Sequence, residues 1–167
     1  MRALVRVSVI GPADATRAAL VAAEEVGRLL AQAGAVTVTG GLGGVMEAAS
    51  RGAATAGGAT VGLLPGDDPD QANPYVQLPL ATGLGHARDV LVATTSDAVI
   101  AVAPSWGTLA EASLAMRASI PVVTIGRWAL PAGLAIPSVD SAAAAVEWVL
   151  DAASRAKRPA GVPRPSR

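Results

Sequence analysis

The candidate functional residues of this chain lie beside glycines. The stretch TVTGGLGGVMEAASRGA, residues 37–53, places four glycines in five positions between a β-type run and a helical pattern: Gly40, Gly41, Gly43 and Gly44. The first N–H groups of a helix have no partner within the helix, and glycine lets an anion approach them without meeting a Cβ. The run therefore predicts a phosphate-binding turn. The alternative is that the glycines serve tight packing of the strand against the helix, at positions whose φ is positive.

Two other strand-to-helix junctions carry small or turn residues, Gly11-Pro12 and the segment APSWGTLAEASLAM at 103–116. Glu111 lies one turn inside the second helix, where its carboxylate faces either solvent or the mouth of a cleft; taken alone, it is a partner for the helix dipole. Trp106 is either a stacking surface for a base or a lid over the core. Together the two junctions predict ligand contacts at Gly11, Ser105, Trp106, Gly107 and Thr108.

A further polar group stands in TGLGHARDV, residues 82–90. Arg88 is expected near the start of a helix; taken alone, it would form a surface ion pair with Asp89 or a neighbouring acid. His86 is either a structural or solvent-facing residue or a contact for a base or ribose, and Met46, in the helix after the glycine turn, is a candidate for the same contact. The glycine spacing is neither G-x-G-x-x-G nor a P-loop with Lys, so it supports neither an ordinary NAD site nor an ATP motor.

Strands and helices are predicted to alternate along the chain. The pattern predicts strands at 2–10, 36–39, 59–64, 76–80, 97–102, 121–125 and 134–139, and helices at about 16–33, 44–56, 84–95, 107–118 and 141–156. The apolar positions expected in the first helix are Leu20, Val21, Val26, Leu29 and Leu30. Residues 66–74 are expected to form a polar surface loop. Strands 97–102 and 121–125 are apolar on both faces, as in a parallel sheet covered on each side.

The fold class is therefore α/β: a doubly wound, mostly parallel sheet with helices on both faces, Rossmann-like and three-layered. Ligands bind such folds at the carboxyl ends of the strands, near the point where the strand order reverses. Residues 1–156 are expected to form a single Rossmann-like nucleotide-binding domain. The segment KRPAGVPRPSR, residues 157–167, is expected to be a flexible, basic and proline-rich tail.

Composition excludes several classes of function. The 13 basic and 13 acidic residues balance, which argues against a general nucleic-acid binder. The absence of Cys excludes disulfides, thiolate metal sites and a Cys nucleophile, and the single His argues against a zinc site, so no metal is expected. Arg6 interrupts the N-terminal apolar run and no apolar segment has the length of a membrane span, so we expect a cytoplasmic protein without a membrane partner.

Taken together, GGLGGVMEAASRGA, GLGHARDVLV and SDAVIAVAPSWGTLAE resemble the Rossmann-type family once named "possible lysine decarboxylases". That family includes the "lonely guy" cytokinin-activating phosphoribohydrolases and the molybdenum cofactor carrier proteins. The resemblance covers residues 4 to 127. It implies that Arg88 and Glu111 take the places of the catalytic pair that cleaves an N-glycosidic bond, and that Gly107 and Thr108 take the places of the turn that holds the 5′-phosphate. It also implies a homodimer or a higher homo-oligomer.

The chain departs from the enzymes of the family at several positions. Ala103, Pro104 and Ser105 stand where the enzymes have Pro-Gly-Gly, and Pro104 has no N–H to offer a phosphate. Ala87 and Asp89 replace a Glu and a Lys. The spelling of the glycine turn is closer to the branch that holds the cofactor carriers and many bacterial proteins.

Two functions follow. The first is binding or carrying a phosphorylated nucleotide-like molecule or cofactor, such as a nucleotide or the molybdenum cofactor, at the glycine-rich helix starts. The alternative is a phosphoribohydrolase acting on a nucleoside 5′-monophosphate, so whether the chain is an enzyme stays open. Lysine decarboxylation has little support, because Lys157 is the single Lys and lies in the tail. A structural assembly platform, with the Ala-rich helices packed across a dimer interface, is a third hypothesis.

Overall fold

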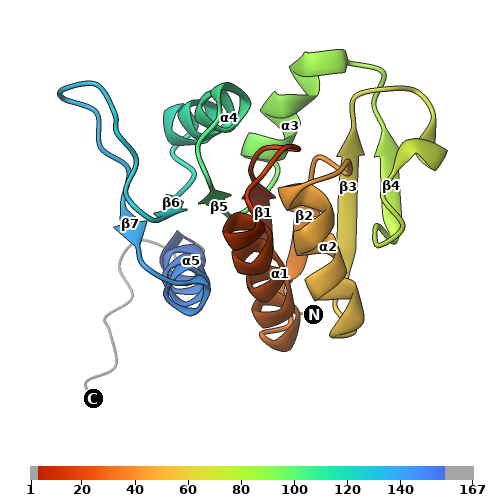
Figure 1. The fold of residues 1–167 in the computed structure, drawn as a ribbon, viewed down its shortest axis with the longest axis horizontal. Coiled ribbons are helices and arrows are strands. Elements are labelled where there is room, and N and C mark those ends of the chain that lie inside the picture. Colours follow the sequence, from red (N-terminus) through yellow and green to blue (C-terminus); the bar gives the residue numbers. More distant parts are fainter. Residues whose placement is uncertain (1–3, 157–167) are drawn as a thin grey trace.

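The structure is a computed structural model that describes residues 4–156. The tail predicted at 157–167 lies outside the described residues. The chain forms a seven-stranded sheet in the order β4-β3-β2-β1-β5-β6-β7 (Figure 1), and every neighbouring pair is parallel. The strands are β1 Arg6–Ile10, β2 Val36–Thr39, β3 Thr60–Leu64, β4 Leu78–Ala81, β5 Ala98–Val102, β6 Val122–Ile125 and β7 Ser138–Val139.

Five helices cover the two faces of this sheet. They are α1 Arg17–Gln32, α2 Val45–Thr55, α3 Arg88–Thr94, α4 Trp106–Arg117 and α5 Ala142–Ala156, with short 3-10 turns η1 Pro69–Gln71 and η2 Gly85–Ala87. Side chains of α1, α2 and α5 pack on Val7, Val9 and Ile100 in one core. Side chains of α3 and α4 pack on Ile10, Val99 and other strand residues in a second core on the opposite face. The predicted three-layer, doubly wound α/β fold is confirmed.

The outer parts of the sheet differ from the sequence prediction. β4 begins at Leu78 rather than at 76, and the last strand shrinks from 134–139 to the two residues Ser138–Val139. Prolines at 131 and 137 remove backbone donors around that segment, and β7 lies at the edge of the sheet, where fewer pairings hold a strand. Within the loop predicted at 66–74, Pro69–Gln71 form a single 3-10 turn.

Helices α1 and α2 approach each other through residues without side chains. A Cβ on Gly27 would lie 2.0 Å from the Ala49 carbonyl oxygen, and one on Gly52 would lie 1.9 Å from the Glu24 carbonyl oxygen. This contact decides which face of α1 is buried. Among the apolar positions expected in this helix, Val26 and Leu30 are buried, whereas Val21 lies on the outer face with its side chain 60% exposed.

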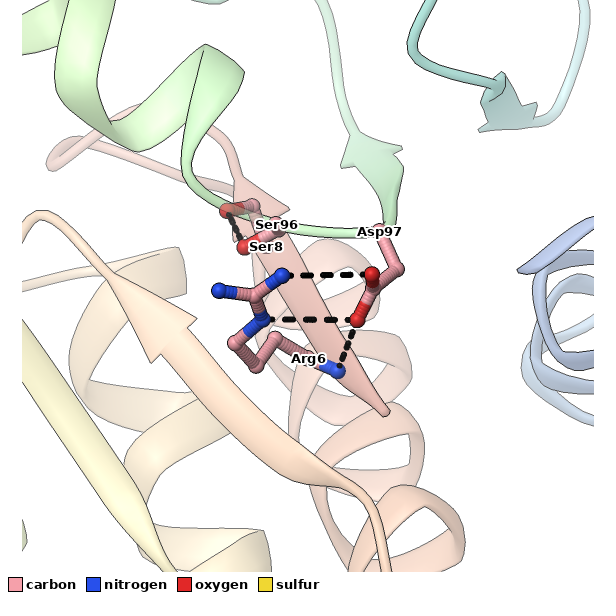
Figure 2. A network of polar contacts seen from close by, with 4 residues as sticks. All are labelled: Arg6, Ser8, Ser96 and Asp97. Carbon is pink, nitrogen blue, oxygen red and sulfur yellow. Dashed lines mark hydrogen bonds and ion pairs between the residues drawn. The ribbon is translucent and has the colours of Figure 1, made fainter. Parts of the chain in front are cut away.

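A polar network fixes the beginning of β1 against the segment before β5 (Figure 2). The Arg6 backbone N–H donates to Asp97 Oδ2 at 2.8 Å, and the Arg6 guanidinium donates to both Asp97 oxygens. The Ser8 hydroxyl donates to the Val92 carbonyl at 2.6 Å and lies 2.6 Å from the Ser96 hydroxyl. Ser8 and Ser96 are buried, so these bonds satisfy polar groups that water does not reach.

Candidate functional site

Three strand-to-helix junctions meet at one edge of the sheet. β1 lies between β2 and β5, and all three strands are parallel, so the turns that follow them leave the sheet at the same edge. The strand order reverses between β1 and β5, which is where doubly wound folds bind ligands. The glycine turn after β2 and the junction after β5 therefore flank the segment that follows β1.

The four glycines of the turn have different reasons to be glycine. Gly41 and Gly44 have φ values of +76° and +65°, a region that side chains disfavour. A Cβ on Gly40 would lie 2.0 Å from Nη1 of Arg88. A Cβ on Gly43 would meet no atom of the described chain within 4 Å, and its φ is not positive. Neither the backbone conformation nor the packing therefore requires a glycine at position 43, and the space beside Gly43 is open.

Asn73, which the sequence pattern placed in a polar surface loop, is a buried residue that holds the glycine turn. Its backbone N–H donates to the Gly41 carbonyl at 2.8 Å, and its Nδ2 donates to the Leu42 carbonyl at 2.9 Å. On the other side, the Gly41 N–H donates to the Thr39 hydroxyl at 3.1 Å. These bonds fix the turn without a ligand. The Asn-Pro pair at 73–74 marks a turn in the sequence but does not reveal this contact.

The helices that follow the two junctions begin differently. No side chain caps α2 at Gly44, so the N–H groups of Met46 and Glu47, which have no intrahelical carbonyl, are left for another acceptor. At α4 the Ser105 hydroxyl accepts a hydrogen bond from the Thr108 N–H at 3.1 Å and lies 2.7 Å from the Thr108 hydroxyl. The Ser105 hydroxyl thus already bonds an N–H group at the start of α4 that an anion could otherwise bind. The start of α2 has no such cap, so it has more N–H groups free for a ligand.

Arg88 reaches from the start of α3 to the glycine turn. Its side chain is 9% exposed, and its Nε is buried without a hydrogen-bond partner in the described part of the chain. Nη1 lies against Gly40, as does the sulfur of Met46. The ion pair with Asp89 exists, with Arg88 Nε 3.6 Å from Asp89 Oδ1, but the alternative that placed it on the surface was wrong. A buried guanidinium N–H without an acceptor is unusual in a folded protein, which singles Arg88 out as a candidate site residue.

Glu111 approaches the same group from α4. The residue is 9% exposed, so the alternative of a solvent-facing carboxylate was wrong. The pKa of Glu111 rises from 4.5 to about 7, mainly because of burial and also because of the negative charge of Asp89, while Arg88 opposes the rise. The electrostatic coupling shows that Arg88, Asp89 and Glu111 form one cluster. A carboxyl group that titrates near neutral pH can donate or accept a proton.

The remaining predicted residues lie around this cluster or away from it. Gly11 has a packing reason of its own, since a Cβ there would lie 2.5 Å from the Val102 carbonyl oxygen. His86 is exposed in η2. Gly107 is exposed at the start of α4, and Thr108 is buried. Their contacts with a ligand remain predictions.

Trp106 is separated from the Arg88 cluster. Its side chain is 90% exposed, so the alternative of a lid over the core was wrong. It lines a groove of about 690 Å³ between the outer face of α4 and residues 129–136, together with Leu109, Met116 and Leu134. Glu111 lies on the opposite, buried face of the same helix. Any stacking on Trp106 would therefore take place in this groove.

Residues 4–156 contain no group of three or more His, Cys, Asp or Glu side chains arranged to hold a metal ion. None of their helices combines the length and the apolar character that crossing a bilayer requires.

The fold and this edge define a class: a Rossmann-like α/β protein with a glycine turn, an uncapped helix start and a buried arginine at the switch point of its sheet. Residues 4–153 match the sequence model of the SLOG cluster4 family (LDcluster4), and the chain belongs to this family. The resemblance to the group of lonely guy enzymes and cofactor carriers is thereby confirmed.

Individual relatives agree with this assignment. An uncharacterized protein of Archaeoglobus fulgidus is 40% identical over 114 residues, which are 68% of this chain and 75% of that protein. The molybdenum cofactor binding protein of Rippkaea orientalis superposes with a TM-score of 0.85 and 33% identity, covering 90% of this chain and 98% of that one. The molybdenum cofactor carrier protein of Chlamydomonas reinhardtii gives a TM-score of 0.82 and 38% identity, covering 92% and 99%.

A more distant match shares the fold alone. DNA processing protein A of Streptococcus pneumoniae superposes with a TM-score of 0.69 and 21% identity, covering 89% of this chain and 61% of that one. The doubly wound sheet is thus common to proteins that differ widely in sequence.

Proposed function

We propose that this protein binds and carries a phosphorylated small molecule of the nucleotide or pterin-cofactor type, held by the glycine turn and the start of α2. The observation that carries the proposal is the buried Arg88, whose unbonded Nε and whose Nη1 against Gly40 place a positive charge beside that turn. Phosphate oxygens would accept hydrogen bonds from the guanidinium and from the N–H groups at the start of α2.

The structural neighbours support a cargo of the molybdenum-cofactor class. Two of them are molybdenum cofactor binding or carrier proteins that match nearly all of their own length. The residues at this edge of the sheet fit such a group, because Gly43 leaves open space beside the uncapped helix and Arg88 supplies an unpaired donor. The cargo would contribute its own chemistry, while this chain would bind the phosphate and orient the ring.

The proposal is tested by substituting Arg88 and measuring binding by isothermal titration calorimetry. The probes are AMP, GMP and ribose 5-phosphate, with isolated molybdenum cofactor under anaerobic conditions. Arg88→Ala is expected to weaken binding about 10- to 100-fold, since hydrogen bonds to charged groups contribute about 1.5–3 kcal/mol. Arg88→Lys keeps the charge but not the planar fork, so it should recover part of the loss.

The matched control is Arg155→Ala, which removes an exposed arginine in the last turn of α5. Its affinity should stay within about twofold of the wild-type value, because exposed charges at a distance are screened by salt. If the wild-type protein binds none of the four probes, the proposal is wrong. Equal affinities for Arg88→Ala and wild type would remove Arg88 and its neighbouring turn as the site.

A second candidate function is hydrolysis of a nucleoside 5′-monophosphate to the free base and ribose 5-phosphate. The observation that favours it is Glu111, whose pKa near 7 and coupling to Arg88 and Asp89 suit a group that positions water or stabilises positive charge on the ribose. Base release from AMP or isopentenyl-AMP, followed by chromatography, tests it. Glu111→Gln should abolish release; equal rates for this variant and the wild type would exclude the hydrolase.

A further inference from the structure

The two hydrogen bonds from Asn73 to the glycine turn determine how two peptide groups of the turn are oriented. The Asn73 backbone N–H binds the Gly41 carbonyl and its Nδ2 binds the Leu42 carbonyl, so both carbonyl groups point toward this one residue. None of the described peptide bonds is cis. In a trans peptide group the carbonyl and the following N–H point in opposite directions. The N–H groups of Leu42 and Gly43 therefore both point away from Asn73.

These two N–H groups are free to bind a ligand. Within residues 4–156, neither the Leu42 N–H nor the Gly43 N–H donates a hydrogen bond. A Cβ on Gly43 would have no neighbour within 4 Å, so the turn adjoins open space at the residue that provides one of the two donors. The φ of +76° at Gly41 is typical of turns in which successive N–H groups point to one side and form a concavity that binds anions.

The side chain of Asn73 is fixed in the orientation that this arrangement needs. The residue is 8% exposed, and its Oδ1 accepts a hydrogen bond from the Tyr75 N–H at 3.1 Å. The amide thus meets an N–H group on its oxygen side and the Leu42 carbonyl on its nitrogen side. An asparagine satisfies both neighbours in one orientation, whereas a carboxylate has no donor for the carbonyl.

The charges around the turn make these N–H groups more important. The Nη1 of Arg88 lies against Gly40 and brings positive charge to the turn. The carboxyl groups of Asp89 and Glu111 interact with Arg88 and offset part of that charge. Directed N–H groups of the backbone are therefore needed to hold an anion at this place.

We propose, building on the proposed function, that Asn73 is a positioning residue that aims the N–H groups of Leu42 and Gly43 at one phosphate group of the ligand. The phosphate oxygens accept hydrogen bonds from both N–H groups. Asn73 acts through the turn and does not touch the ligand itself.

Amide resonances of the full chain test this inference without any substitution. Proton–nitrogen correlation spectra are recorded by NMR while AMP or ribose 5-phosphate is added. The amide protons of Leu42 and Gly43 should move downfield and rank among the largest changes. The amide proton of Val99, which already bonds the Pro121 carbonyl in the middle of the sheet, should stay in place.

A substitution then tests the role of the side chain. Asn73→Ala removes Nδ2 and Oδ1 but keeps the backbone N–H. It should weaken AMP binding at least about 10-fold in calorimetric titrations, because hydrogen bonds to a charged group lose their alignment. It should also reduce the downfield shifts of Leu42 and Gly43. The matched control is Thr82→Val, which removes a 2.7 Å hydrogen bond to the Leu64 carbonyl outside the turn; its affinity should stay within about twofold of the wild-type value.

The outcomes separate this inference from the proposed function. If AMP or ribose 5-phosphate binds while the amide protons of Leu42 and Gly43 stay in place, the inference is overturned and the proposed function stands. Equal affinities of Asn73→Ala and wild type, or an equal loss in Thr82→Val, would also overturn it. If neither probe binds, the inference fails, and the proposed function then depends on GMP and the molybdenum cofactor. Should Asn73→Ala not fold, the wild-type spectra decide the matter.

Discussion

At the scale of single residues, Glu111 has the least favourable electrostatic surroundings for an ionised carboxyl group among the described residues. It is buried next to Asp89, and the guanidinium of Arg88 offsets this only in part, so its pKa rises to about 7. Around neutral pH the folded protein contains both the protonated and the ionised form. The protonated form donates a hydrogen bond, and the ionised form repels an anion.

This shift makes stability depend on pH. Between pH 4.5 and about 7, folded Glu111 holds a proton that the unfolded chain has released, so the free energy of unfolding falls as pH rises through this window. The loss is up to about 3.5 kcal/mol, at 1.4 kcal/mol per pKa unit. Urea titrations from about pH 5 to 8 should show this fall for the wild type and a smaller one for Glu111→Gln. Parallel curves for the two proteins would show that Glu111 titrates normally.

At the scale of elements, two glycines show that the same residue type can have different roles in helices. Gly52 lies in the contact between α1 and α2, and Gly107 lies at the start of α4. Gly52 faces a carbonyl oxygen of α1, whereas Gly107 faces open space, where the nearest atom to an added Cβ would be the Ser105 hydroxyl oxygen at 3.9 Å. In isolation, alanine is the better helix former at both places by about 1 kcal/mol. Packing therefore decides whether alanine stabilises or destabilises the protein at Gly52, and helix propensity decides this at Gly107.

We therefore predict opposite effects for the same substitution. Gly52→Ala should destabilise the protein by about 2 kcal/mol or more, because overpacking against a backbone oxygen forces the two helices apart. Gly107→Ala should leave stability unchanged or raise it by up to about 1 kcal/mol. Chemical denaturation of both variants measures the difference. A stable Gly52→Ala protein would mean that α1 and α2 are not so close.

At the scale of the whole molecule, periodicity predicted most of the architecture and local chemistry predicted part of the site. The alternation of buried strands and helices was sufficient for the layers, because β5 and β6 are apolar on both faces. The glycine turn and Arg88 could be singled out by residue type. Asn73 could not, since its role depends on a contact with Leu42, 31 residues away, that no local pattern encodes. The burial of Glu111 depends likewise on the packing of α4 against α3.

The oligomeric state is a prediction for the whole molecule that rests on the family resemblance. The outer face of α4 exposes Trp106 and Met116, and exposed apolar patches on a folded protein often mark interfaces. We expect a homodimer by light scattering coupled to size-exclusion chromatography, and a shift toward monomer for Trp106→Glu. Val21→Glu, at an exposed apolar site on α1, is the matched control. A wild-type monomer at micromolar concentration would contradict the prediction.

The hydrogen bonds that Asn73 and Thr39 make to the glycine turn have a consequence for the exchange of a bound ligand. Because the carbonyl groups of Gly41 and Leu42 already accept hydrogen bonds within the chain, the glycine turn is held in shape without a ligand. Little ordering entropy of the turn itself is then lost on binding. If the chain carries a phosphorylated cargo as proposed above, the contacts at the turn would set the speed of release, and a receiving enzyme would compete for the phosphate.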